Sequence, residues 1–214
     1  MGITERKERE KQRRRQEILR AAEKVFFTKG IDHSTMDDVA EEAELSKGTL
    51  YLYFKSKEEI HWEIAQKHML RVTEDMMQAL DDRKNAVENL QIMARIFAQH
   101  FDEEHEAAHS ILFFQACDLN NLNLNHEQIR HTFIHDSPIH LVTKYVEQGM
   151  AEGLIRNDIS ENALSSTLWA QLMGVLQIIT LKRDLFELIG VSREDIIESH
   201  IKIALNGILA NGSN

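Results

Sequence analysis

The sequence predicts an all-α fold, and three observations carry that prediction. Proline, which interrupts helices, occurs once among 214 residues. The commonest residues are helix formers such as alanine, leucine, glutamate and lysine. No segment alternates apolar and polar residues at the spacing of a strand, and no Asn-Gly hairpin signal separates two apolar runs. We therefore expect helices throughout the chain and no strands.

The first sixty residues contain several helix boundaries. A first helix is expected to have one apolar face from Ile18 onward and to end at Gly30, which can adopt a left-handed cap conformation. Thr35, Ser46 and Ser56 each stand where a hydroxyl can accept a hydrogen bond from the first N–H groups of a following helix. The segment therefore divides into a first helix, two short helices and the start of a long one.

The two short helices have the dimensions of a helix-turn-helix. Each is expected to span about eight residues, and residues 44–47 form the turn between them. In this motif the first short helix supports a second helix that enters the major groove of DNA. The spacing of the caps thus favours a nucleic-acid-binding unit at this end of the chain.

Residues 34–60 resemble the DNA-binding signature of the TetR family of bacterial transcriptional regulators. The resemblance lies in the run Ser-Thr-Met-Asp-Asp-Val-Ala, in Leu-Ser-Lys-Gly-Thr-Leu-Tyr-Leu-Tyr-Phe, and in Lys-Ser-Lys-Glu-Glu-Ile. Glu44 stands where the family usually has glycine, and a weaker resemblance resumes at residues 147–177. The resemblance to this family implies a homodimer in which residues 1–57 form a helix-turn-helix domain and residues 58–214 form a helical effector-binding and dimerisation domain.

The resemblance also implies which residues contact DNA. Phosphate contacts would come from Thr35, Tyr53 and Lys57, major-groove contacts from Lys47, Gly48, Thr49 and Tyr51, and a thymine methyl contact from Leu52. Hydroxyl and ammonium groups can donate to phosphate oxygens and base edges, and glycine permits close approach of the backbone. On the alternative interpretation, the two tyrosines only cover a core formed by Leu50 and Phe54.

The rest of the chain is expected to be a series of long helices. After Ser56 a helix of about 25 residues should link the two parts, by its apolar spacing. Further amphipathic segments are expected at residues 86–101, 106–119, 127–152 with a kink at Pro138, 161–181 and 193–209.

Residues 161–181 are apolar around most of a helical circumference, so one face should pack inside its own domain and another against a partner subunit. With residues 193–209, this segment would form a four-helix dimer interface. The expected interface residues are Leu168, Leu172, Val175, Ile197, Ile201 and Leu205. The alternative is that both segments are core helices of a monomer.

Family members bind effectors between their middle helices, which implies a cavity for a small apolar effector in this chain. The apolar residues expected around it are Phe97, Phe101, Phe113, Phe114, Met150, Trp169 and Met173. Aromatic and methionine side chains at helical spacing also form filled cores, and that alternative stays open.

Seven of the eleven histidines lie between His100 and His140. Within this segment, His105 with His109 and His131 with His135 have the i,i+4 spacing that can chelate a metal from one helix face. A metal sensor or a helical metal-dependent enzyme is therefore the alternative function. Because no cysteine or glutamate completes a zinc signature, and no phosphate loop or nucleophile elbow is present, we expect no catalytic residue, metal or cofactor.

Charge is distributed unevenly along the chain. The net charge is −10, but residues up to Lys57 include 13 Lys or Arg against 11 Asp or Glu, while the remainder has 12 against 24. Eight cations lie between Arg6 and Arg20, which favours a polyanion contact at this end or a solvated helix with i,i+4 ion pairs. The single cysteine, Cys117, and the absence of an apolar leader favour a cytoplasmic protein.

Overall fold

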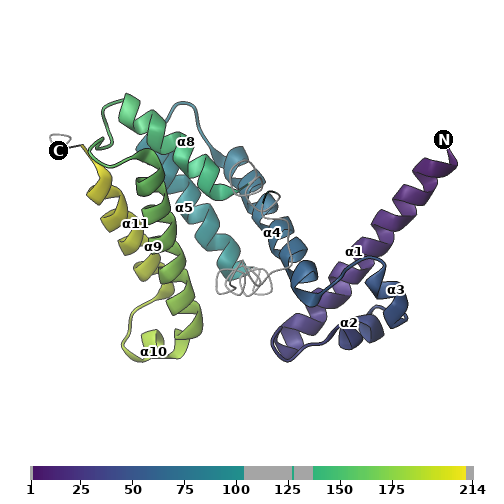
Figure 1. The fold of residues 1–214 in the computed structure, drawn as a ribbon. Coiled ribbons are helices and arrows are strands. Elements are labelled where there is room, and N and C mark those ends of the chain that lie inside the picture. Colours follow the sequence, from purple (N-terminus) through teal and green to yellow (C-terminus); the bar gives the residue numbers. More distant parts are fainter. Residues whose placement is uncertain (1, 104–126, 128–136, 211–214) are drawn as a thin grey trace. The chain divides into compact units, whose positions relative to one another are not determined.

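The computed structural model describes residues 2–103, 127 and 137–210 (Figure 1). Over these residues the chain folds into nine α-helices and contains no strand, although Ile155 and Leu209 form an isolated antiparallel bridge. The helices are α1 (Ile3–Lys29), α2 (Met36–Glu42), α3 (Lys47–Tyr51), α4 (Lys57–Ala79), α5 (Ala86–Glu103), α8 (Pro138–Ala151), α9 (Glu161–Leu181), α10 (Arg183–Leu188) and α11 (Arg193–Ile208). The all-α prediction is confirmed, and the helix expected at residues 106–119 lies outside the described residues.

The described residues form two compact units. Those up to His68 belong to the first unit, and those from Met69 onward belong to the second. Helix α4 begins in the first unit and continues into the second.

In the first unit, hydroxyl caps begin the helices as the sequence predicts. The Thr35 hydroxyl accepts from the Asp38 N–H at 3.2 Å, and the Asp38 carboxylate accepts from the Thr35 N–H at 2.8 Å. The Ser46 hydroxyl caps α3 in the same way. These local bonds satisfy N–H groups that lack partners at the start of a helix, which fixes where each helix begins.

The turn between α2 and α3 keeps a left-handed residue even though glycine is absent. Glu44 has φ of 54°, and the Leu45 N–H donates to the Ala40 carbonyl at 2.8 Å to close the turn. A side chain in this conformation costs about 1 kcal/mol. The hydrogen bond and the burial of the flanking helices offset that cost.

One apolar core holds the first unit together. It comprises Ile18, Leu19, Ala22, Val25, Phe26, Ile31, Val39, Ala40, Leu50, Phe54, Ile60 and Ile64. Every one of the first four helices contributes to it, so α3 is packed on a rigid support.

In the second unit α8 packs on α5 and α9, and α11 packs on α5 and α9 (Figure 1). Pro138 is the first residue of α8, so the kink expected there is wrong. At the first position of a helix the missing N–H of proline would have no partner in any case. After α8, the Arg156 N–H donates to the Ile208 carbonyl at 2.9 Å and ties this segment to the end of α11.

Helix α9 is the one described helix that is long and apolar enough to cross a membrane, and 33% of its apolar window is buried inside the chain. A core or interface helix of a water-soluble domain meets the same criterion. Its exposed apolar side chains include Ile178 and Leu181.

A buried histidine makes the first unit sensitive to acid. His61 on α4 is 3% exposed, and its ring centroid lies 6.0 Å from that of Phe26 on α1. Burial, with a smaller contribution from the charge of His68, lowers the pKa of His61 to about 4. The histidine is therefore neutral in the folded chain at neutral pH.

We predict that the first unit loses stability as pH falls from about 7 to about 4. The unfolded histidine has a pKa of about 6.5, so between these values the unfolded state binds a proton that the folded state does not. The loss should reach roughly 2 kcal/mol between pH 7 and pH 5. Urea unfolding of the chain and of His61→Gln at both pH values measures it, and equal pH dependence in the two proteins would contradict the prediction.

Candidate nucleic-acid interface and internal cavity

Helix α3 has a buried side and an exposed side. Leu50 and Phe54 are both 0% exposed and fix the helix to the core. Lys47, Gly48 and Tyr51 are exposed, and Leu52 immediately after the helix is 77% exposed. The side chains that the resemblance assigns to the major groove therefore lie on the free side of a firmly anchored helix, except that Thr49 is only half-exposed.

Lys47 is held by an exposed carboxylate. Its Nζ lies 2.8 Å from Oδ1 of Asp37 at the start of α2, and this hydrogen bond raises the pKa of Lys47. An exposed ion pair of this kind contributes little, because water screens the two charges. The lysine can thus exchange Asp37 for a phosphate or a base edge at small cost. The sequence reasoning did not identify this aspartate.

Lys57 has an internal role that local sequence does not reveal. Its ammonium donates to the carbonyl oxygens of Ile31 at 2.8 Å and Ser34 at 3.1 Å. These bonds tie the start of α4 to the segment that precedes α2. The phosphate contact expected of Lys57 stays a prediction, and making it would require the ammonium to leave at least part of this position.

The other two residues expected to contact phosphates, Thr35 and Tyr53, also form hydrogen bonds inside the chain. The Thr35 hydroxyl, besides accepting from Asp38, donates to the Asp38 carboxylate at 2.8 Å. The Tyr53 carbonyl accepts from the guanidinium of Arg15 at 2.9 Å, and its half-buried side chain packs on the core. Their contacts with DNA stay predictions too.

A small apolar cavity lies inside the second unit. Its volume is about 50 Å³, and Phe97 and Trp169 meet in its wall edge to face, with ring centroids 4.8 Å apart. The side chains around it come from α4, α5, α8, α9 and α11. Almost all of them are apolar, and the exceptions are the His200 imidazole and the indole N–H of Trp169.

Of the residues expected around a cavity, Phe97 and Trp169 line this one. Phe101 and Met173 are buried in the core beside it, and Met150 on α8 is half-buried. Phe113 and Phe114 lie outside the described residues.

The residues expected at a dimer interface lie mostly on the inner side of their helices. Leu172 and Ile201 are 7% and 2% exposed in the single chain, and both line the cavity with Leu168 and Leu205. Val175 and Ile197 are half-buried. A side chain already packed in its own fold has little surface left for a partner, and the dimer contacts of these residues stay a prediction. The exposed apolar residues of α9 and α11 are instead Ile178, Leu181 and Ile203.

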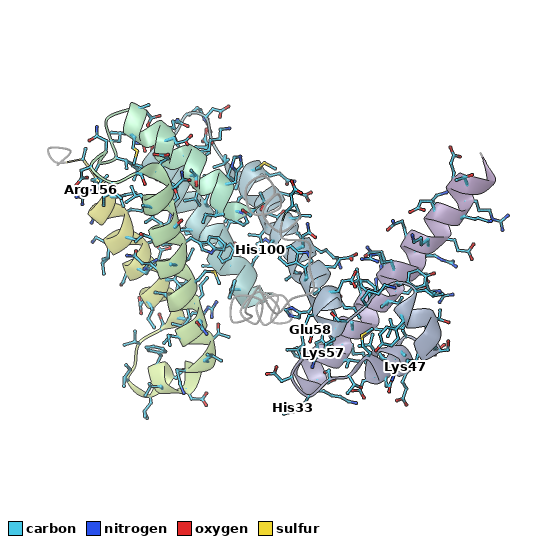
Figure 2. All side chains as sticks on the ribbon, in the orientation of Figure 1. His33, Lys47, Lys57, Glu58, His100 and Arg156 are labelled. Atoms are coloured by element: carbon cyan, nitrogen blue, oxygen red, sulfur yellow. The ribbon has the colours of Figure 1, made fainter. Side chains whose placement is uncertain are left out.

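The histidine-rich segment falls largely outside the described residues, which include neither His105 with His109 nor His131 with His135. His100 is described, and its Nε2 lies 2.7 Å from Oδ2 of Asp75 (Figure 2). Among the residues that the structure describes, no three histidine, cysteine or acidic side chains converge as metal ligands would.

We predict that Lys57→Ala lowers the free energy of unfolding by about 1 to 2 kcal/mol, because the carbonyl oxygens of Ile31, Asp32 and Ser34 lose a charged donor. Lys47→Ala, which breaks only an exposed pair, should change it much less. Thermal or urea unfolding of both variants measures the difference. Unchanged stability in Lys57→Ala would show that the internal contacts contribute nothing.

Known proteins resemble this chain in sequence. Residues 18–63 match the family described as bacterial regulatory proteins, tetR family. A segment of 50 residues is 52% identical to the uncharacterized HTH-type transcriptional regulator YfiR of Bacillus subtilis, covering 23% of this chain and 24% of YfiR. The matches to the first curated relatives span about a quarter to about half of their length.

Solved structures resemble the chain over nearly all of its length. A tetR family transcription regulator from Shewanella sp. PV-4 superposes with a TM-score of 0.71 at 14% identity, covering 92% of this chain and 99% of that one. The Thermus thermophilus repressor FadR, solved with lauroyl-CoA, gives 0.66 at 20% identity, covering 92% and 96%. At these identities the structures show a shared fold, and the match at residues 18–63 adds the signature. Residues 18–63 thus match the tetR family of bacterial regulatory proteins, and the chain shares the fold of the solved structures that it resembles.

Proposed function

We propose that this protein is a sequence-specific DNA-binding transcriptional regulator, and specifically a repressor that a small apolar effector releases from its operator. The observation that carries the proposal is α3, which Leu50 and Phe54 anchor while Lys47, Gly48 and Tyr51 stay exposed. A rigid helix with a free polar side is what reading of a major groove requires. We assign DNA binding to residues 1–57, effector binding and dimerisation to residues 58–214, and a cytoplasmic location.

A regulator of this kind would act as a homodimer. On α9 the residues Ala170, Gly174 and Ile178 are exposed and follow one another at intervals of four, with Leu181 at the end of the same line. A Cβ atom placed on Gly174 would meet nothing within 4 Å, so another helix can approach closely there. Ile203 on the neighbouring α11 is 72% exposed and extends the surface. We propose that a second copy of the chain covers these residues in an isologous contact.

The cavity supports an effector that is mainly apolar. Drug-sized ligands occupy roughly 300 to 1,000 Å³, whereas this cavity measures about 50 Å³. The described form is therefore too small for such a ligand, and an effector must move the walls to fit. Burial lowers the pKa of His200, which keeps the imidazole neutral and suits an uncharged hydrogen-bonding group rather than an anion.

Effector binding would change DNA binding through helices that line the cavity and also belong to the DNA-binding unit or the proposed dimer surface. Met76 on α4 lines the cavity, and the same helix begins at Lys57 in the first unit. Leu172 and Ile201 line the cavity from the helices that carry the proposed dimer surface. A wall displacement would therefore change the spacing of the two DNA-reading helices. These features favour a regulator over the metal-dependent enzyme considered from the sequence.

We predict that the purified protein selects an inverted repeat from a random DNA pool, with half-sites about one helical turn or a small multiple of it apart. Tyr51→Ala should relax base preference in each half-site at a cost of about 1 to 3 kcal/mol. Lys144→Ala, an exposed change in the second unit, is the control. Selection of no sequence would refute the proposed function, and a single asymmetric site bound by one chain would refute the dimer.

We predict that a compact, uncharged alcohol such as cyclohexanol binds the cavity and weakens operator binding. Coupling is reciprocal, so a factor of about 5 to 150 on DNA affinity must reappear in the affinity for the alcohol. Calorimetric titrations with and without operator DNA measure it. In Ala94→Phe the new ring fills the cavity and should abolish alcohol binding. If the alcohol binds the parent protein equally well with and without DNA, the cavity is not an allosteric site.

A further inference from the structure

The first half of α1 extends beyond the packed part of its unit. The first residue of α1 in the apolar core is Ile18, and the first to contact α4 is Arg15. Every residue from Thr4 to Arg13 is exposed. Figure 1 shows this end of α1 running past α2 and α3. Residues 3–14, which we call the arm, add a rod about 18 Å long at 1.5 Å per residue.

The arm is strongly basic in a chain whose net charge is −10. Six cations face three glutamates along it, namely Arg6, Lys7, Arg9, Lys11, Arg13 and Arg14 against Glu5, Glu8 and Glu10. Arg14 pairs with Glu17 at 2.8 Å. Within the part of the chain that the structure describes, Arg6, Lys7 and Lys11 have no ion pair. Lys7, Lys11 and Arg14 follow the i, i+4, i+7 spacing, so three cations line one side of the helix.

The composition of the arm indicates what covers it. Ile3 is the one apolar residue of the arm, and none lies between Thr4 and Glu17, so the arm has no apolar face with which to insert into a membrane surface as amphipathic helices do. A protein interface of ordinary kind would also need apolar or aromatic side chains at its centre. What remains is the attraction of several exposed cations to a regular array of negative charges, which is how proteins bind the DNA backbone.

We propose that the arm binds DNA phosphates outside the base pairs contacted by α3, and so adds affinity and salt dependence without sequence preference. This inference rests on the proposed function, since it places the arm on the same DNA molecule. The next position on the same line of the helix is Ile18, which lies in the apolar core. The cations therefore lie on the side by which α1 packs into the DNA-binding unit. The arm and α3 are parts of one unit, and Arg15 joins α1 to the segment that follows α3.

The test compares three variants with the parent protein on an operator fragment that extends at least one helical turn beyond the selected site. Lys7→Gln with Lys11→Gln removes two unpaired cations from the arm. Lys84→Gln with Lys144→Gln removes the same charge from the second unit and is the matched control. Glu8→Gln with Glu10→Gln makes the arm more basic. Circular dichroism checks that each variant is folded, and none of these side chains lies in a core.

We expect the slope of log K against log salt to fall by roughly two per chain in the arm variant, at about 0.9 per phosphate contact. The control should keep the parent slope, and the Glu8/Glu10 variant should bind more tightly. On a fragment trimmed to the selected site, the parent should lose affinity and the arm variant should lose little. The ratio of operator to scrambled-DNA affinity should be the same in all proteins.

Two outcomes would overturn the inference while the proposed function stands. One is a parent protein that selects an operator while the arm variant and the control have equal slopes and affinities. The other is a changed operator-to-scrambled ratio in the arm variant, which would mean that the arm reads sequence. A parent protein that selects no DNA sequence refutes the proposed function itself, and is recognised before any variant is made.

Discussion

The first unit depends on the contacts of Arg15. Its guanidinium donates to the Glu63 carboxylate on α4 at 2.9 Å and to the Tyr53 carbonyl after α3 at 2.9 Å, and it lies 4.1 Å from the centre of the Phe54 ring. Both charged side chains are about three-quarters buried. A charge-assisted, bidentate pair in that setting is directional, and removing one partner would leave the other buried without compensation. One side chain thereby fixes three segments, and α3 gains its orientation without any apolar contact on its free side.

This arrangement explains why the polar residues near α3 are mostly engaged. Lys57 binds the carbonyls of Ile31 and Ser34, Thr35 exchanges hydrogen bonds with Asp38, and Lys47 pairs with Asp37. A short helix has few intrahelical bonds and little buried area, so its surroundings must supply the remaining order. The engaged groups differ in what it costs to free them. Lys47 can leave an exposed carboxylate readily, while Lys57 would leave carbonyl oxygens that help to position the start of α2.

How much the sequence could predict follows from the range of each interaction. Caps such as Thr35 and the periodicity of residues 161–181 are local, and the structure begins and ends those helices where the pattern indicates. The contact of Lys57 with Ile31 spans 26 positions and leaves no local pattern. Pro138 fits both a kink and a helix start, and the expectation of a kink was wrong because α8 begins at this residue. The dimer residues have a different difficulty. A helix that is apolar all round does not reveal which side is internal, so the sequence could not show that Leu172 is buried within its own chain.

The two-sided character of α9 also connects ligand binding to assembly. Leu172 on its inner side lines the small cavity, while Ile178 on its outer side is 50% exposed. A helix transmits a displacement as a rigid body, because its backbone hydrogen bonds resist bending on the scale of a side chain. A ligand that enlarges the cavity by displacing α9 or α11 must also move whatever packs on the outer sides of these helices. Separate helices for cavity and surface would let one relax without the other. Because these two helices serve both, the energy of widening the cavity along them is also an energy of repacking the outer surface.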